Sequence, residues 1–364
     1  MTRTIRRISS TNTLRAGVVG VGWAGEQHAD AYAKLPGVEL AGIAGLEEPV
    51  RTELAERLGV ERHVATWEEL LEDESLDVVS VAVPTFLHTP IAIAALERGL
   101  HVLCEKPIAR TPEEAAAMVA AAEKAGRILD VAFNRRQRND IQALRRLIEA
   151  GRLGKPYYTK AWWLRRSGIP TLGSWFTSRE TAGGGPLVDL GVHLLDYALF
   201  LIGQPKVTTV SASTYDLLGS AGFGGASIPG KTGGSGEFDV EDLASAFLRL
   251  DDGGTLLVET SWATHRTDDM QFGITIYGTE GGAELRVDET LGTGTLTVFS
   301  EVDGVPAVMQ LDPEPGGGHD EVVEQFLDAV RAGEGGQGAA AAELARVVDA
   351  CYRSAEAGRE IALS

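Results

Sequence analysis

The sequence predicts an α/β protein in which a doubly wound parallel sheet is followed by a second domain of alternating strands. In residues 14–134, short apolar strands alternate with helical segments, the pattern of a parallel sheet covered by helices. Past about residue 150 the candidate strands alternate polar and apolar residues between turn sequences. The length of 364 residues also exceeds what one ordinary core holds.

Composition narrows the class of protein. Apolar residues make up 44% of the chain and aromatic residues 6%, as in a globular protein, and no apolar run is long enough to span a bilayer. The net charge of −19 argues against a binder of nucleic-acid backbone, which needs clustered Lys and Arg. Cys104 and Cys351 lie far apart, without a zinc-binding spacing. We therefore expect a cytoplasmic protein that binds no metal, nucleic acid or membrane.

Four shorter features of the sequence can each be interpreted by themselves. Residues 1–13 are basic but lack an apolar segment, so we expect a flexible tail rather than a secretory signal. The Gly- and Ser-rich residues 219–236 fit either a mobile loop without function or a lid over a substrate. The sequence "RRQR" at 135–138 fits a solvated helix start or a ligand contact, and His319 fits a helix start.

The first strand leads into a glycine-rich turn. From Leu14 the chain runs through a short apolar strand into Gly20, Gly22 and Gly25, which form GxGxxG before a helical segment. The first two glycines permit a tight turn and the close approach of a pyrophosphate, and the third lets the helix pack on the strand. This order of elements predicts a dinucleotide site. Its candidate contacts are Gly20, Gly22, Trp23, Ala24 and Gly25.

The strand–helix alternation continues to residue 134. We predict strands at 38–45, 77–83, 101–105 and 128–134, and helices at 49–58, 89–99 and 111–126. Ligands of such sheets lie beyond the carboxyl ends of the strands. This places "PTFLH" (84–88) and "EKP" (105–107) at the ligand edge. Thr85, His88, Glu105 and Lys106 are therefore candidate cofactor contacts, although His88 also fits a helix cap.

The second strand bears on the choice of cofactor. It ends at Gly45 and Leu46, and Glu47 and Glu48 follow. A glutamate reaching the adenine ribose favours NAD, whereas an open Gly45 leaves room for the 2′-phosphate of NADP. Arg51 lies one helical turn further on. We expect NAD with Glu47 as a contact, and NADP stays open.

Two further segments carry chemical groups in apolar surroundings. Lys106 follows a buried strand, where it can stabilise a substrate oxygen or pair with Glu105, and its bond to Pro107 can be cis. Residues 183–203 predict a buried helix on which Asp189, His193 and Asp196 fall within about 60° of one another. This stripe fits either a core histidine held by a carboxylate or an active-site wall.

These segments together resemble one family. The GxGxxG turn, "VPTFLH", "HVLCEKPIARTPEEAAAMVAAAEKAG", "FNRR" and "GGGPLVDLGVHLLD" have the order and spacing of the Gfo/Idh/MocA oxidoreductases, and the resemblance extends to "SAEAGREIAL". It implies an N-terminal Rossmann domain at 14–136. An α/β domain with a mostly antiparallel open sheet would follow at 137–364, with a C-terminal helix that packs back on the first domain. Alternating segments at 156–166, 207–218, 243–263 and 272–287 agree.

The resemblance also implies roles for residues. Lys106, Asp189 and His193 match the family's catalytic positions, with His193 as the base for a substrate hydroxyl. Apart from the resemblance, Arg166 and Trp175 are candidate substrate contacts, because Arg donors and aromatic faces suit sugar hydroxyls and rings. The catalytic residues are candidate substrate contacts as well, and Asp196 fits either a substrate contact or a structural role. Family members commonly form dimers or tetramers, so a homodimer or homotetramer is expected.

The function implied is NAD(P)-dependent transfer of hydride between nicotinamide and a secondary hydroxyl or ketone of a sugar, inositol or related polyol. One alternative is a glycoside hydrolase that uses NAD for transient oxidation. Another is a sugar- or nucleotide-sensing protein without turnover.

Overall fold

The computed structural model describes residues 13–224, 236–266, 270–289 and 292–363. They form two compact units: unit 1 is Met1–Asn134 with Gly318–Ala345, and unit 2 is Arg135–Gly317 with Arg346–Ser364. The predicted tail up to residue 12 and residues 225–235 of the predicted loop lie outside the described residues. Among the described residues, no helix is long and apolar enough to cross a membrane.

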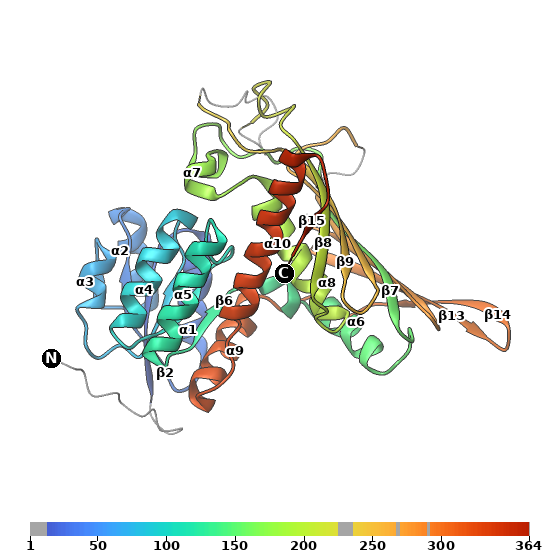
Figure 1. The fold of residues 1–364 in the computed structure, drawn as a ribbon. Helices are drawn as coiled ribbons and strands as arrows, with labels where there is room; N and C mark the ends of the chain where they lie inside the picture. The colour runs from blue at the N-terminus through green and yellow to red at the C-terminus, as the bar shows by residue number, and fades with distance from the viewer. Residues whose placement is uncertain (1–12, 225–235, 267–269, 290–291, 364) are drawn as a thin grey trace. The chain divides into compact units, whose positions relative to one another are not determined.

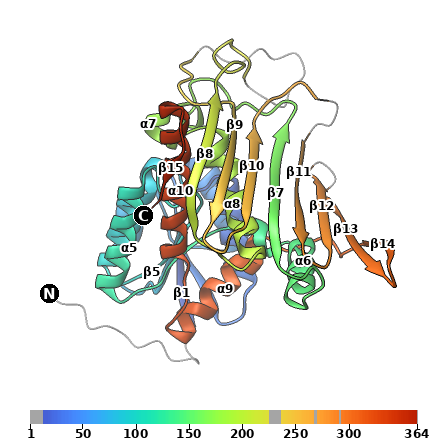
Figure 2. The same cartoon turned by 45° about the vertical axis from the view of Figure 1, so that its right-hand side comes forward.

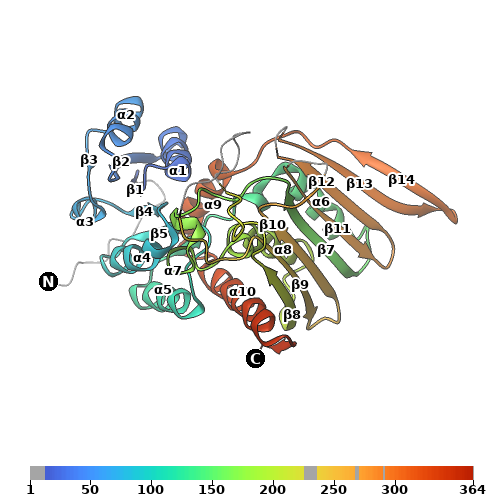
Figure 3. The same ribbon diagram turned by 90° about the horizontal axis from the view of Figure 1, so that it is seen from above.

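Unit 1 contains a six-stranded parallel sheet in the order β3-β2-β1-β4-β5-β6 (Figure 1). Helices α1 and α2 lie on one face of the sheet and α4 and α5 on the other (Figure 3), so the doubly wound prediction is confirmed. The strands are β1 (Leu14–Val19), β2 (Val38–Ala44), β3 (His63–Val64), β4 (Val78–Val81), β5 (His101–Cys104) and β6 (Leu129–Val131). The helices are α1 (Trp23–Lys34), α2 (Glu48–Leu58), α3 (Trp67–Leu71), α4 (His88–Glu97), α5 (Pro112–Ala125) and α9 (His319–Ala332).

Helix α9 joins unit 1 although it follows most of unit 2 in the chain. Its Val323 and Phe326 are fully buried in the same core as Val18 and Tyr32. The buried hydroxyl of Tyr32 has a hydrogen-bond partner in this core, because it lies 2.9 Å from Ser80 Oγ. Packing of the apolar face of α9 therefore completes the core around β1 and α1.

Unit 2 contains a nine-stranded sheet in the order β14-β13-β12-β11-β7-β10-β9-β8-β15 (Figure 2). Only β7 and β10 pair in parallel among its described strands, which agrees with the mostly antiparallel prediction. The strands are β7 (Pro156–Arg165), β8 (Val207–Tyr215), β9 (Leu243–Leu250), β10 (Thr255–Ser261), β11 (Met270–Gly278), β12 (Gly282–Asp288), β13 (Thr293–Val302), β14 (Val305–Leu311) and β15 (Ile361–Ala362). Strands β13 and β14 were not predicted.

Helices cover one face of this sheet. Residues of β7 alternate between buried and partly exposed positions, as expected for a sheet packed on one side. The helices are α6 (Asn139–Glu149), α7 (Arg179–Ala182) and α8 (Val192–Leu201), and Arg145 of α6 donates to the carbonyl of Phe200 on α8. Helix α10 (Gly338–Ala357) begins in unit 1 and ends in unit 2.

Arg136 is buried, so the prediction of a solvated helix start at 135–138 is wrong for this residue. It lies in the 3-10 turn Asn134–Gln137, and its Nε donates to Asp196 Oδ2 at 2.9 Å while its Nη2 pairs with Oδ1. Both side chains are less than one-tenth exposed. Burial raises the pKa of Asp196, against the opposing effect of the Arg136 charge. The two charges therefore depend on each other in the core of unit 2.

We expect Asp196→Ala to lower the free energy of unfolding by about 3–5 kcal/mol, because it leaves a buried guanidinium without its counter-charge. The double variant Arg136→Met/Asp196→Leu should recover most of that loss, since it removes both charges at similar volume. Urea denaturation followed by circular dichroism measures both. A loss below about 1 kcal/mol in Asp196→Ala would contradict the assignment.

His101 makes the stability of unit 1 depend on pH. Its Nδ1 accepts the Ile128 N–H at 3.0 Å, and Arg127 Nη1 lies 3.0 Å from its Nε2. Burial, reinforced by the Arg127 charge, lowers the pKa of His101 to about 4. Between about pH 4 and the unfolded value of about 6.5, the unfolded chain binds a proton that the folded chain does not. The contribution is therefore complete above about pH 6.5 and is lost as the pH falls toward 4.

His101→Asn should reduce this pH dependence, because Asn keeps an acceptor for the Ile128 amide but does not titrate. Urea midpoints at about pH 5 and about pH 7 should differ less in the variant than in the wild type. Equal differences in the two proteins would show that His101 is not the titrating group.

Candidate active site

The three glycines of the β1–α1 turn each occupy a position with a distinct steric requirement. Gly20 has φ +109°, and a Cβ there would lie 1.9 Å from the Ala82 carbonyl oxygen. At Gly25 a Cβ would lie 2.0 Å from the Gly20 carbonyl oxygen, so this glycine lets α1 pack on the turn. At Gly22 a Cβ would meet nothing within 4 Å. The turn therefore leaves open the one glycine that a pyrophosphate must approach.

Helix α1 begins directly at this turn. Gly22 is its N-cap and supplies no side-chain hydrogen bond, so the first N–H groups remain directed at the approach to the turn. Trp23 is 67% exposed at the first helical position, and Ala24 beside it is half-buried. These residues fit the binding of a dinucleotide phosphate.

The end of β2 bears on the adenosine side of such a ligand. Arg51 is buried and donates to the Gly45 carbonyl. A Cβ on Gly45 would lie 2.6 Å from a methyl group of Val21, so Gly45 is packed rather than open. Glu47 is exposed at the N-cap of α2. A side chain at position 45 would therefore collide with Val21, and the nearby Arg51 already binds the Gly45 carbonyl.

Residues after β4 and β5 form the second part of this edge. Thr85 is buried in the 3-10 turn Thr85–Leu87. His88 begins α4, and its Nε2 and Nδ1 each lie 2.8 Å from a carbonyl, those of Val83 and Pro107. The ring thus links the end of β4 to the EKP segment. Burial lowers the pKa of His88.

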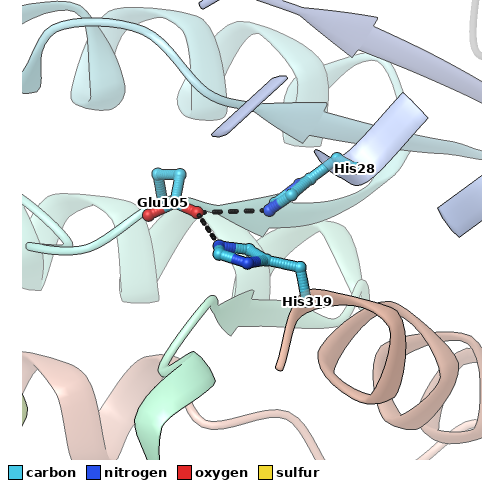
Figure 4. Close-up of side chains that lie close together, drawn as sticks. All are labelled: His28, Glu105 and His319. Carbon is cyan, nitrogen blue, oxygen red and sulfur yellow. Dashed lines mark hydrogen bonds and ion pairs between the residues drawn. The ribbon is translucent and has the colours of Figure 1, made fainter. Parts of the chain in front are cut away.

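Lys106 is partly exposed after β5, and its peptide bond to Pro107 is cis, as the sequence allowed. Its backbone N–H donates to Glu105 Oε2 at 3.0 Å. The other carboxylate oxygen, Oε1, lies 3.2 Å from Nε2 of His28 and 3.3 Å from Nε2 of His319 (Figure 4). Hydrogen bonds and charge from the two imidazoles hold the pKa of Glu105 well below its usual range despite burial.

Sequence reasoning missed the cluster of His28, Glu105 and His319. His319 begins α9, so its interpretation as a helix start is confirmed. His28 lies inside α1 and Glu105 follows β5. No sequence spacing relates three residues on three distant elements, so only the packing of α9 onto unit 1 reveals the cluster.

In unit 2, a buried carboxylate fixes the segment that carries Asp189. Glu241 accepts the N–H groups of Gly185 at 3.0 Å and Leu187 at 2.9 Å, and Thr260 donates to the Pro186 carbonyl at 3.1 Å. A Cβ on Gly184 would lie 2.0 Å from the Tyr352 hydroxyl oxygen. Glycine at this position lets the chain pass directly beneath that side chain.

The predicted stripe of Asp189, His193 and Asp196 spans two kinds of helix, because His193 and Asp196 lie three residues apart on α8 whereas Asp189 lies in the turn before it. Residues Leu187–Gly191 form a π-helical turn before α8, and a π turn changes the angular relation between Asp189 and the residues that follow. The three groups contact different elements: Asp189 Oδ2 accepts Trp262 Nε1–H at 2.9 Å, and Asp196 binds Arg136. His193 is 5% exposed, with its ring 5.8 Å from that of Trp163.

A charged network lies beside His193. Glu289 Oε2 accepts Trp163 Nε1–H at 3.0 Å, and its two oxygens pair with Arg135 and Arg165 at 3.0 and 3.3 Å. The Arg135 guanidinium lies 4.8 Å from the centre of the Trp163 ring. This network holds the indole against which His193 packs. The sequence pointed to Arg135 through "FNRR" and "RRQR", whereas Glu289 lay outside every motif.

Two of the candidate substrate contacts, Arg166 and Trp175, are more exposed than Asp196 and His193. Arg166 is exposed one residue after β7, and Trp175 is half-buried and stacked on Phe176 with ring centres 3.7 Å apart. Asp196 is occupied by Arg136, which favours its structural role over a substrate contact. Lys106 belongs to unit 1, whereas Asp189 and His193 belong to unit 2.

A cavity of about 750 Å³ in unit 1 contains none of the predicted site residues. It is lined by residues that include His101 at the start of β5 and Leu129 at the start of β6. Ligands of doubly wound sheets lie at the opposite, carboxyl ends of the strands. This cavity is therefore separate from the predicted cofactor edge.

Comparison with known proteins identifies both parts of the chain. Residues 14–133 match the model described as an oxidoreductase family with an NAD-binding Rossmann fold, and residues 141–284 match the Gfo/Idh/MocA C-terminal domain. The D-glucoside 3-dehydrogenase of Escherichia coli strain K12 is 31% identical over 369 residues, which cover 97% of this chain and 99% of that protein. The levoglucosan dehydrogenase of Pseudarthrobacter phenanthrenivorans is 32% identical over 283 residues, covering 74% and 72%.

The fold agrees with solved structures. A levoglucosan dehydrogenase in complex with NADH and levoglucosan superposes with a TM-score of 0.83 at 28% identity, covering 96% of this chain and 99% of that one. Unit 1 carries the NAD-binding Rossmann domain, in agreement with the open approach at Gly22. The chain is therefore an NAD-binding oxidoreductase that belongs to the Gfo/Idh/MocA family.

Proposed function

We propose that the protein oxidises a secondary hydroxyl of a sugar, inositol or related polyol with NAD, and reduces the matching ketone in reverse. The observation that carries this proposal is that Asp189 and His193 in unit 2 are each held by neighbouring side chains. Glu241 and Trp262 hold the Asp189 segment by hydrogen bonds, and Trp163 packs beside the imidazole. The relatives act on carbohydrates, according to their names.

In the proposed mechanism, His193 takes the proton of the substrate hydroxyl, a task suited to imidazole, whose ordinary pKa is about 6.5. Asp189, fixed by the Trp262 indole, orients the substrate or the imidazole. The Lys106 ammonium stabilises negative charge on the substrate oxygen. Bound NAD supplies the hydride acceptor.

We further propose NAD rather than NADP as the cofactor used. Arg51 is bound to the Gly45 carbonyl, and Glu47 at the start of α2 would repel a 2′-phosphate. A ribose 2′-hydroxyl instead suits a carboxylate partner.

A panel assay distinguishes the proposed dehydrogenase from its alternatives. Purified protein is mixed with NAD or NADP and a series of sugars, inositols and polyols, and absorbance of the reduced nicotinamide is followed. An increase in this absorbance with NAD supports the proposed dehydrogenase activity. Release of aglycone from a chromogenic glycoside without net cofactor change would instead support the hydrolase, and cofactor or sugar binding without turnover would support a sensor.

His193→Ala should lower kcat by about 10²–10⁴-fold, because it removes the general base, while the affinity for NAD stays nearly unchanged. Calorimetry measures the cofactor affinity and the panel assay measures kcat. His265→Ala is the matched control, since His265 is exposed in unit 2 and outside the proposed site. Equal activity of the two variants would rule out His193 as the base.

We propose that the protein is a homo-oligomer joined through the uncovered face of the unit 2 sheet. Tyr277, Phe299 and Val308 lie in one cross-strand row, because Tyr277 and Phe299 both pair with Gly282 and Phe299 pairs with Val308. They are 46%, 39% and 67% exposed. An exposed apolar row on a sheet is a candidate for burial between subunits.

Sedimentation velocity tests this assembly. The wild type should sediment as a dimer or tetramer, and Phe299→Lys/Val308→Lys should shift it toward the monomer without loss of secondary structure. A monomeric wild type at micromolar concentration would contradict the proposal.

We also propose a cytoplasmic location, which the two free, buried cysteines favour. Fractionation of the producing cells tests this location.

A further inference from the structure

Two histidines from opposite ends of the chain meet one carboxylate in unit 1. His28 on α1 and His319 at the start of α9 both direct Nε2 to Oε1 of Glu105, at 3.2 and 3.3 Å (Figure 4). The exposed fractions of His28, Glu105 and His319 are 0%, 7% and 9%. Buried charge at this depth requires donors, and both imidazoles supply them.

The hydrogen-bond partners of the rings indicate which nitrogen carries the proton. Nδ1 of His28 is buried and has no hydrogen-bond partner among the described residues. A bare lone pair there costs less than a buried N–H without an acceptor, so the proton belongs on Nε2. The Asn134 side-chain nitrogen lies 3.4 Å from both ring nitrogens of His319 and does not distinguish them, but a carboxylate oxygen only accepts, so the contact of Glu105 Oε1 with Nε2 requires the proton on Nε2. Both imidazoles therefore donate Nε2–H to Glu105 rather than offer a lone pair to a cation.

The other oxygen of the carboxylate reaches the main chain of Lys106. Glu105 Oε2 accepts the Lys106 N–H at 3.0 Å, and the carbonyl of the next residue, Pro107, lies 2.8 Å from Nδ1 of His88. The backbone is therefore held on both sides of Lys106. Removal of either imidazole would take away one of the two donors to Oε1 and leave the carboxylate less firmly held against the Lys106 N–H.

We propose that His28 and His319 are positioning residues that act through Glu105. They fix the main chain at Lys106 and thereby set the position that its ammonium group can reach. This proposal rests on the role of Lys106 in the proposed function. It gives helix α9 a role in catalysis, because α9 supplies His319 from 214 residues beyond Glu105 along the chain. Displacement of a catalytic group by about 1 Å can lower a rate by about 10²-fold.

The test compares Leu and Gln at each histidine. Leu removes the donor, whereas the Gln side-chain amide places an N–H near the position of Nε2. We expect His319→Leu and His28→Leu to lower kcat by about 10–100-fold with NAD affinity within about 3-fold of the wild type. His319→Gln and His28→Gln should recover most of kcat.

His101→Leu is the matched control, because His101 is also buried in unit 1 and lies four residues before Glu105, on β5. It should lower the melting temperature as the other Leu variants do but leave kcat unchanged. If His28→Leu does not fold, His319→Leu is the variant of choice, because His319 lies at the start of a helix rather than inside one.

A second measurement does not depend on turnover. The pH profile for acylation of Lys106 by an amine-reactive reagent, followed by mass spectrometry, reports the surroundings of its amine directly. This profile should shift in the Leu variants and return in the Gln variants. If the wild type oxidises no polyol but the profile shifts as expected, the proposed function fails while the positioning by His28 and His319 holds.

Three results would overturn the inference. The first is an unchanged kcat and labelling profile in both Leu variants. The second is an equal loss of kcat in His101→Leu, which would indicate a general effect of buried histidines. The third is about one equivalent of zinc in the purified wild type that is absent from His319→Leu, because the cluster would then be a metal site rather than a hydrogen-bonded one.

Discussion

Close backbone approach at the β1–α1 turn is the constraint on which unit 1 depends. Any side chain at Gly20 or Gly25 would collide with main-chain oxygen atoms about 2 Å away, so α1 can begin beside the sheet only with glycine at both positions. The same geometry leaves Gly22 open and places Trp23 and His28 on successive turns of the helix. Cofactor approach and the Glu105 cluster therefore share one structural origin.

Unit 2 depends instead on carboxylates with little solvent exposure that are paired with donors on other elements. Glu241 binds two backbone amides and the Tyr352 hydroxyl, Asp196 binds Arg136, and Glu289 binds Trp163 and two arginines. Each pairing offsets the cost of burying charge. Together they give a rigid frame to the segment that carries Asp189 and His193.

Elements were predicted correctly where a pattern within a few residues of sequence marks them, and were missed where no such pattern exists. Unit 1 was predicted well because its strands are short apolar runs between helices, a pattern visible within a few residues. Strands β13 and β14 were missed because many of their residues are exposed and show little apolar alternation. The π turn at Leu187–Gly191 was missed because an apolar segment of that length carries no signal for a wider turn.

The same distinction applies to the candidate site. The sequence by itself determined the glycine turn, the EKP segment and the Asp189–His193 pair, since each is a local motif whose residue types reflect a local requirement. Only the tertiary structure decided that Asp196 belongs to Arg136, that Glu289 supports Trp163, and that His28 and His319 meet at Glu105. Those contacts join residues far apart in the chain, and their distances depend on how helices and strands pack, which no spacing in the sequence encodes.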